Sequence, residues 1–116
     1  MSKHHGSCHC GAVSFEAEGD FENAISCNCS ICQKKGTFLA FVPESAFQLL
    51  SGESSLTDYQ FGKKKIHHTF CKTCGVTAFA SGQAPDGTKM KAVNVRCLDG
   101  VNLKSLQINE IDGRSF

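Results

Sequence analysis

Short stretches of alternating apolar and polar residues recur along this chain, and turn-forming residues separate them. A strand is predicted from Cys8 to Ala17, and one of its faces carries Val13, Phe15 and Ala17. Cys8 and Cys10 are predicted to share the opposite face, where both sulfur atoms can reach one metal ion. Short periodic segments between frequent turns are typical of a mainly β fold.

Further strands are also predicted to be short. They cover residues 37–42, 47–50, 56–61, 66–70, 76–80 and 90–98. In the last of them Val93, Val95 and Cys97 share one face. This pattern predicts that Cys97 packs in the interior as a small apolar residue.

Helical structure is predicted only as single turns. One turn covers Ser30–Lys35 and ends at Gly36. It places Cys29 and Cys32, which are three residues apart, on one side. A second turn is predicted after Pro43, because proline suits the first position of a helix.

Composition narrows the class of protein. The 116 residues fit one domain over 1–116, with a net charge of +1 when histidine is neutral. A nucleic-acid partner is not expected, because basic residues with interleaved aromatics are missing, and the run Lys63 to Lys65 is interpreted as a solvated turn. No stretch is apolar enough to cross a membrane or to form the core of a signal peptide. We therefore expect a cytoplasmic protein with reduced thiols.

Seven of the eight cysteines fall into three clusters, namely Cys8 with Cys10, Cys27 with Cys29 and Cys32, and Cys71 with Cys74. Zinc in proteins is usually tetrahedral, with four protein ligands in a structural site and three in a reactive one. The two pairs together make four ligands, whereas the triplet supplies three and leaves one position free. The spacing therefore favours two Zn²⁺ ions per chain, one structural and one able to take a substrate. The alternatives are a disulfide framework, iron in the four-sulfur site and part of an iron–sulfur cluster at the triplet.

The segment from Cys71 to Gly75 has the form of a zinc knuckle, a tight turn whose backbone amides point at two sulfur atoms. Gly75 allows the backbone a conformation that a side chain would resist. One such pair cannot close a tetrahedron, and Cys8 and Cys10 are the other available pair. A metal clip between these two segments closes a long loop, so that metal binding contributes to folding.

The sequence leaves the fourth ligand at the triplet open between water, a substrate thiol and another protein residue. Cys97 is the main protein rival, although its predicted strand face favours core packing. None of the five histidines is expected to bind zinc. They are His4, His5, His9, His67 and His68. The first two are placed in a frayed terminus, and the last two can line a pocket near the metal.

Together these motifs resemble the signatures of the glutathione-dependent formaldehyde-activating enzyme family, also called the centromere protein V family. The segments that carry the resemblance are residues 6–13, 27–32 and 70–75, and residues 93–101 resemble the end of bacterial members. The resemblance runs from Gly6 to about Arg114. It implies a β-tent of small antiparallel sheets around zinc. It also implies a structural zinc on Cys8, Cys10, Cys71 and Cys74, and a catalytic zinc on Cys27, Cys29 and Cys32.

The activity that the resemblance implies is synthesis of S-hydroxymethylglutathione from glutathione and formaldehyde, a carbon–sulfur lyase reaction. The expected partner is therefore a small-molecule thiol, glutathione. Its carboxylates need cations, for which the candidates are Lys34, Lys35, Arg96 and the run Lys63 to Lys65, although a solvated surface role is favoured for each. The alternative functions are a non-catalytic zinc-binding module and a protein that senses thiol oxidants or metals.

Overall fold

Strands make up most of the computed structural model, which describes residues 2–62, 64 and 66–112. The strands are β1 (Ser2–Ser7), β2 (Ser14–Gly19), β3 (Asn23–Cys27), β4 (Leu39–Pro43), β5 (Phe47–Ser51), β6 (Leu56–Tyr59), β7 (His68–Cys71), β8 (Phe79–Gln83), β9 (Lys89–Asn94) and β10 (Gln107–Ile111). One short helix, α1, covers Ser30–Lys35, and single 3₁₀ turns cover Glu44–Ala46, Glu53–Ser55 and Val95–Cys97.

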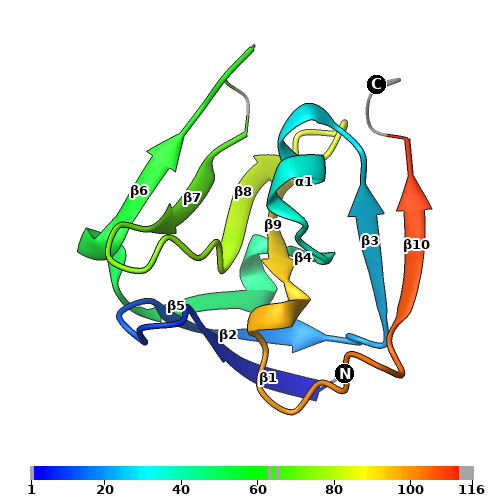
Figure 1. Cartoon of the computed structure of the whole chain (residues 1–116), viewed down its shortest axis with the longest axis horizontal. Coiled ribbons are helices and arrows are strands. Elements are labelled where there is room, and N and C mark those ends of the chain that lie inside the picture. The colour runs from blue at the N-terminus through cyan, green and yellow to red at the C-terminus, as the bar shows by residue number, and fades with distance from the viewer. Residues whose placement is uncertain (1, 63, 65, 113–116) are drawn as a thin grey trace.

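These strands form three small sheets in the described part of the chain. Their strand orders are β1-β2-β5, β10-β3-β4-β9-β8 and β6-β7. All pairs are antiparallel except β10 with β3, which run parallel. Figure 1 shows the first sheet along the bottom, the β6–β7 hairpin on the left and the β3–β10 pair on the right. The predicted mainly β fold of small sheets with short helical turns is thus confirmed.

The core lies where the sheets meet. Phe15 of β2 stacks on Phe47 of β5 with ring centroids 5.2 Å apart, and Phe47 contacts Phe79 of β8 at 4.7 Å. Three aromatic rings therefore join the first sheet to the five-stranded one. Phe15 and Val93 are fully buried. Burial of one such side chain stabilises a fold by about 1.5–3 kcal/mol, so this cluster accounts for much of the contact between sheets.

The single strand predicted from Cys8 to Ala17 is wrong. β1 ends at Ser7, the backbone bends from residue 9 to Val13, and β2 begins at Ser14. The Cys8 amide donates to the Val13 carbonyl at 3.0 Å, which closes a tight loop. Both cysteines therefore lie in a loop rather than on one strand face. The frayed terminus is also wrong, because the segment from Ser2 pairs with β2 throughout.

The strand predicted over 90–98 is too long. It ends at Asn94, whose side-chain oxygen accepts a hydrogen bond from the Arg96 amide at 3.2 Å and starts a 3₁₀ turn. Cys97 consequently does not share a strand face with Val93. The strand predicted over 76–80 begins only at Phe79, and β3 and β10 were not predicted.

The two predicted helical turns are confirmed at Ser30–Lys35 and after Pro43. Gly36 ends α1 with a φ of 70°, in the left-handed region that glycine adopts without strain. The solvated turn at Lys63 to Lys65 is described only in part. Lys64 is exposed, and the other two lysines lie outside the described residues.

Gly52 and Gly87 provide a matched test of the contact between β5 and the cysteine loop. Both have a positive φ, 94° and 90°, so alanine is strained at either position by about 1–2 kcal/mol. A Cβ at Gly52 would also lie 2.6 Å from the Val13 Cα, whereas one at Gly87 would meet nothing within 4 Å. We expect Gly52→Ala to lose roughly 1–3 kcal/mol more unfolding free energy than Gly87→Ala. Urea unfolding of the metal-loaded variants measures this difference, and equal losses would contradict it.

Candidate metal centres

Four cysteine sulfurs gather at the junction of two loops. Cys8 and Cys10 come from the β1–β2 loop, and Cys71 and Cys74 come from the end of β7 and the turn that follows it. All four sulfurs lie within 4.8 Å of one another. The Cys8 and Cys10 sulfurs are 3.7 Å apart, and those of Cys10 and Cys71 are 3.6 Å apart.

These separations suit a tetrahedral metal site. With metal–sulfur bonds of about 2.3 Å, sulfurs at the corners of a tetrahedron around zinc lie about 3.8 Å apart. Disulfide-bonded sulfurs are instead about 2.05 Å apart. All eight cysteines lie in the described part of the chain, and all are free thiols. The first cluster therefore fits a metal ion, and the disulfide alternative is not realised.

The two loops of this four-cysteine cluster share a backbone hydrogen bond and a glycine at equivalent positions. In each, the amide of the first cysteine donates at 3.0 Å to a valine carbonyl five residues later, from Cys8 to Val13 and from Cys71 to Val76. A glycine with positive φ follows the second cysteine, with 84° at position 11 and 81° at Gly75. The backbone alone thus turns both pairs of thiols toward each other.

Backbone amides also favour the ionised form of the sulfurs. The amides of Cys10 and then Val76 donate toward the Cys74 sulfur and lower its pKa to about 6. The amides of Cys74 and Thr73 lower the pKa of Cys71 in the same way. A hydrogen bond to a thiolate stabilises the charged form. At Cys10 the Ala12 amide also lowers the pKa, but the hydrogen bond with Cys71 and burial outweigh it and raise this pKa to about 11. Because metals bind the thiolate and not the thiol, the backbone prepares Cys71 and Cys74 as ligands.

The second cluster surrounds the start of α1. Cys27 ends β3, Cys29 is the residue just before the helix, and Cys32 lies in its first turn. Their sulfurs also lie within 4.8 Å of one another, and all three residues are partly exposed. The Cys29 amide donates to the Cys27 sulfur at 3.4 Å. The spacing of the three thiols therefore suits one metal ion, and the cluster is open to a small molecule.

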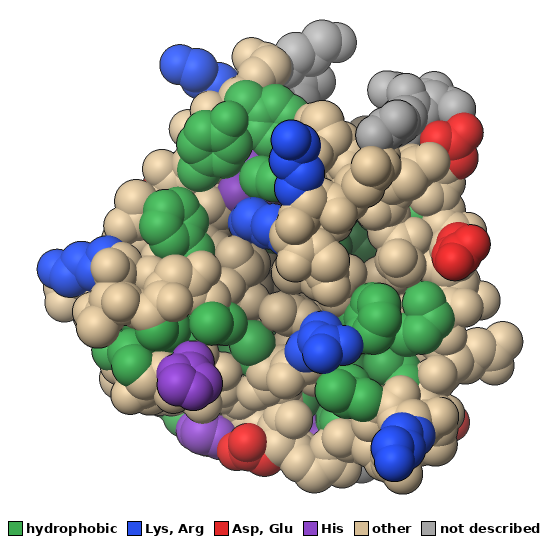
Figure 2. Space-filling model, in the orientation of Figure 1, with side chains coloured by type: hydrophobic (Ala, Val, Ile, Leu, Met, Phe, Trp, Pro, Cys, Tyr) green, Lys and Arg blue, Asp and Glu red, His purple; other side chains and the backbone are tan. Residues whose placement is uncertain are grey.

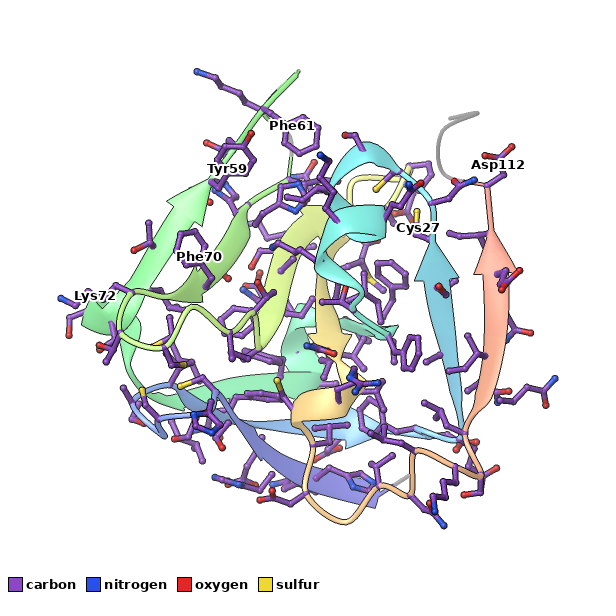
Figure 3. The ribbon with its side chains drawn as sticks, in the orientation of Figure 1. Cys27, Tyr59, Phe61, Phe70, Lys72 and Asp112 are labelled. Carbon is purple, nitrogen blue, oxygen red and sulfur yellow. The ribbon has the colours of Figure 1, made fainter. Side chains whose placement is uncertain are left out.

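The last described strand braces this three-cysteine cluster. β10 pairs in parallel with β3 along its whole length, and the Asn28 side chain donates to Asp112 at 3.0 Å. Figure 3 shows Cys27 and Asp112 at the same end of these neighbouring strands. Sequence reasoning missed this brace because no local pattern connects residues 84 positions apart.

The thiols of this cluster differ in how readily they ionise. Burial and then the neighbouring Cys29 raise the pKa of Cys32 to about 12. For Cys29 burial opposes ionisation, but amide and thiol donors around its sulfur outweigh it and lower its pKa. A metal that binds all three sulfurs must displace protons, so its affinity rises with pH.

Lys35 lies beside the three-cysteine cluster, and His68 lies near Lys35. The Lys35 ammonium donates to the Thr77 hydroxyl at 3.0 Å, although the residue as a whole is exposed. Burial lowers the pKa of Lys35, and negative charge at Cys32 partly opposes this. Burial and the Lys35 charge lower the pKa of His68, which stacks on Phe61 with ring centroids 5.2 Å apart. Lys35 is therefore more than the solvated cation that the sequence indicated.

Cys97 and the histidines stay outside both clusters. The Cys97 thiol donates to the Thr77 carbonyl at 3.6 Å, and burial raises its pKa to about 11. Cys97 packs against the core, as expected, but from a 3₁₀ turn. Among the described residues, no histidine joins a group with metal-site spacing. His5 and His67 instead contact Asp99 and Asp58, at 2.9 and 2.6 Å.

Comparison with known proteins agrees with this arrangement. A model of the family described as glutathione-dependent formaldehyde-activating enzyme matches residues 3–110. The chain belongs to this family. A crystal structure of a Rhodobacter sphaeroides protein from a structural genomics programme has a similar fold. That protein is 36% identical to this chain, and the two superpose with a TM-score of 0.82. The match covers 92% of this chain and 99% of the other protein.

Both cysteine clusters of this family member could hold metal ions by their geometry. None of the helices in the described residues is long and apolar enough to span a membrane.

The two clusters should respond differently to the loss of one sulfur. Cys74→Ser removes a ligand that joins loops about 60 residues apart, so it should lower the unfolding free energy by several kcal/mol, on the scale of a lost structural metal ligand. Cys29→Ser should release one metal ion while the protein stays folded. Elemental analysis combined with thermal unfolding measures both effects, and Cys97→Ala, which should keep both ions, is the control. Equal destabilisation by the two serine variants would contradict different roles.

Proposed function

We propose that this chain is a zinc-dependent enzyme of the carbon–sulfur lyase type that joins glutathione and a small aldehyde, as in S-hydroxymethylglutathione synthesis. The observation that carries the proposal is the contrast between the two clusters. The first cluster brings four sulfurs together, enough to complete a tetrahedron, whereas the second brings only three, all on partly exposed residues. A partly exposed set of three thiols has room for one exchangeable ligand.

The metal assignment follows from the same contrast. We assign a structural zinc to Cys8, Cys10, Cys71 and Cys74, and a catalytic zinc to Cys27, Cys29 and Cys32, in a single domain over 1–116. Four sulfurs close a tetrahedron, so the first ion has no position for a substrate. Soft thiolate ligands select zinc or iron among the common metals, and the absence of a fourth sulfur disfavours an iron–sulfur cluster at the triplet.

The chemistry needs an activated thiol and an accessible carbonyl. When bound at the three cysteines, zinc supplies a Lewis acid that stabilises a coordinated thiolate at neutral pH or polarises a carbonyl oxygen. The three cysteines hold this centre on two rigid elements, since Cys27 ends a paired strand and Cys32 belongs to α1. Lys35 places a positive charge beside the thiolates. The thiol of glutathione can then add to an unhindered aldehyde without a separate protein base.

The compartment and partner belong to the same proposal. Eight free thiols, three of them partly exposed at a metal centre, require a reducing environment such as the cytosol. The small-molecule partner is a thiol, and the family suggests glutathione.

Exchange spectroscopy by NMR tests the activity. Zinc-loaded protein should speed the interconversion of formaldehyde and its glutathione adduct by roughly tenfold or more, which corresponds to about 1.4 kcal/mol of barrier lowering. Cys29→Ser should remove the acceleration because it removes a ligand of the catalytic ion. Cys97→Ala should keep it.

The result that would overturn this activity is an unchanged exchange rate with formaldehyde and with several larger aldehydes. In that case the zinc-module and oxidant-sensing alternatives make different predictions. A sensor should lose its metal from the three-cysteine cluster at low peroxide concentrations, because partly exposed thiolates oxidise readily. A purely structural module should not.

A further inference from the structure

A cavity of about 510 Å³ lies between the end of α1 and the zinc-knuckle turn. Lys35 and Thr37 line it from the segment after the three-cysteine cluster, and Phe70, Thr77 and Asn94 line it from the opposite side. Its volume falls within the range of roughly 300–1,000 Å³ that is usual for small-molecule sites. Formaldehyde needs only a small part of this space, so the cavity suits the thiol partner.

Lys35 connects this cavity to the three-cysteine cluster. It lies three residues after Cys32 in α1, and residues at this spacing are neighbours on one helix face. Its ammonium group reaches across the cavity to the Thr77 hydroxyl at 3.0 Å. Figure 2 shows basic side chains over α1, beside an apolar patch at the end of β6 and the start of β7, where Figure 3 labels Tyr59 and Phe61.

The rest of the cavity wall combines buried hydroxyls with apolar surface. Thr37 and Thr77 are 8% and 9% exposed, so both are nine-tenths buried. The Thr77 hydroxyl accepts from Lys35, and Thr37 lies on the same cavity wall. Phe70 and Val76 supply the apolar part. A cation and hydroxyls beside apolar surface match a carboxylate at the end of a short aliphatic chain.

The charge of the cysteine cluster makes such a cation useful. Three thiolates around a divalent metal leave a net charge of −1, and a substrate thiolate makes it −2. A carboxylate on the same substrate is therefore repelled unless a positive charge lies close to it. Lys35 is near enough to respond to the charge of Cys32, whereas the neighbouring Lys34 is exposed and does not line the cavity.

We propose that Lys35 binds a carboxylate of the thiol substrate in this cavity, so that the site selects thiols that carry a carboxylate over neutral thiols. This inference rests on the proposed function, because it places the substrate sulfur at the three-cysteine cluster. It identifies the cavity as the site for the rest of the thiol molecule, with Thr37 as a second hydrogen-bond donor to the same carboxylate.

The first experiment measures binding without any metal–thiolate bond. S-methylglutathione keeps both carboxylates but has no ionisable thiol, so its affinity for the zinc-loaded protein reports on the rest of the site. We expect Lys35→Met to weaken its binding roughly tenfold, the effect of a lost charge-assisted hydrogen bond. Lys34→Met, the matched control, should change the affinity less than about twofold. NMR titration should show the largest shifts at Thr37 and Thr77.

The diethyl ester of S-methylglutathione completes the test. Its carboxylates are masked, so its weak binding should be the same in the wild type and in Lys35→Met. Equal affinity of acid and ester for the wild type would overturn the proposal. Equal affinity of wild type and Lys35→Met for the acid would also overturn it.

Two further variants distinguish carboxylate binding by Lys35 from a purely structural role. Thr77→Val removes the acceptor of the lysine but keeps the charge, and Lys35→Arg keeps a cation, so both should retain preference for the acid over the ester. If Lys35→Met loses metal or stability while the preference survives in it, the lysine only supports the fold and the proposal fails.

The outcomes for this inference and for the proposed activity are distinguishable. If binding of S-methylglutathione depends on Lys35 but aldehyde exchange is not accelerated, the carboxylate site is supported and the proposed lyase activity is ruled out. If aldehyde exchange is accelerated equally with glutathione and with its diethyl ester, and Lys35→Met does not change the rate, the lyase activity is supported and the proposed carboxylate site is ruled out.

Discussion

The structure depends on the meeting of two backbone loops at four sulfur atoms. Each loop is closed by a hydrogen bond from its first cysteine to a valine five residues later. The contacts between the two loops involve sulfur, such as the 3.6 Å separation of the Cys10 and Cys71 sulfurs. Four thiolates within 4.8 Å of one another would repel one another, and a divalent metal offsets this charge directly.

This junction also bears on the stability of a small chain. A domain of 116 residues buries a modest share of its surface, and among the described residues its aromatic core joins two of the three sheets directly. A metal ion held at the four-cysteine cluster would add stability where β7 meets the loop before β2. The three-cysteine cluster is instead partly exposed and is held by β3 and α1.

Local features of the sequence predicted the sites better than the fold. The three thiols of the second cluster lie within six residues and Gly36 marks the turn after them, while Gly75 marks the turn after Cys74, so the spacing alone indicated which sulfurs lie together. Non-local features were missed. β1 has few apolar residues to show a period, and it is held by backbone pairing to β2. The parallel pairing of β10 with β3 leaves no local mark at all. At Asn94 a side-chain hydrogen bond overrode an alternating pattern that had predicted more strand.

The parallel pair of β3 and β10 has a consequence for how the molecule is made. The thiols at residues 27–32 leave the ribosome well before the strand that braces them. During translation the nascent chain therefore carries these cysteines for a time without β10 beside β3. The pairing with β10 and the hydrogen bond from Asn28 to Asp112 can form only after residue 112 has emerged. This brace is thus added after the chain between β3 and β10 has been made, whatever the speed at which the earlier sheets form.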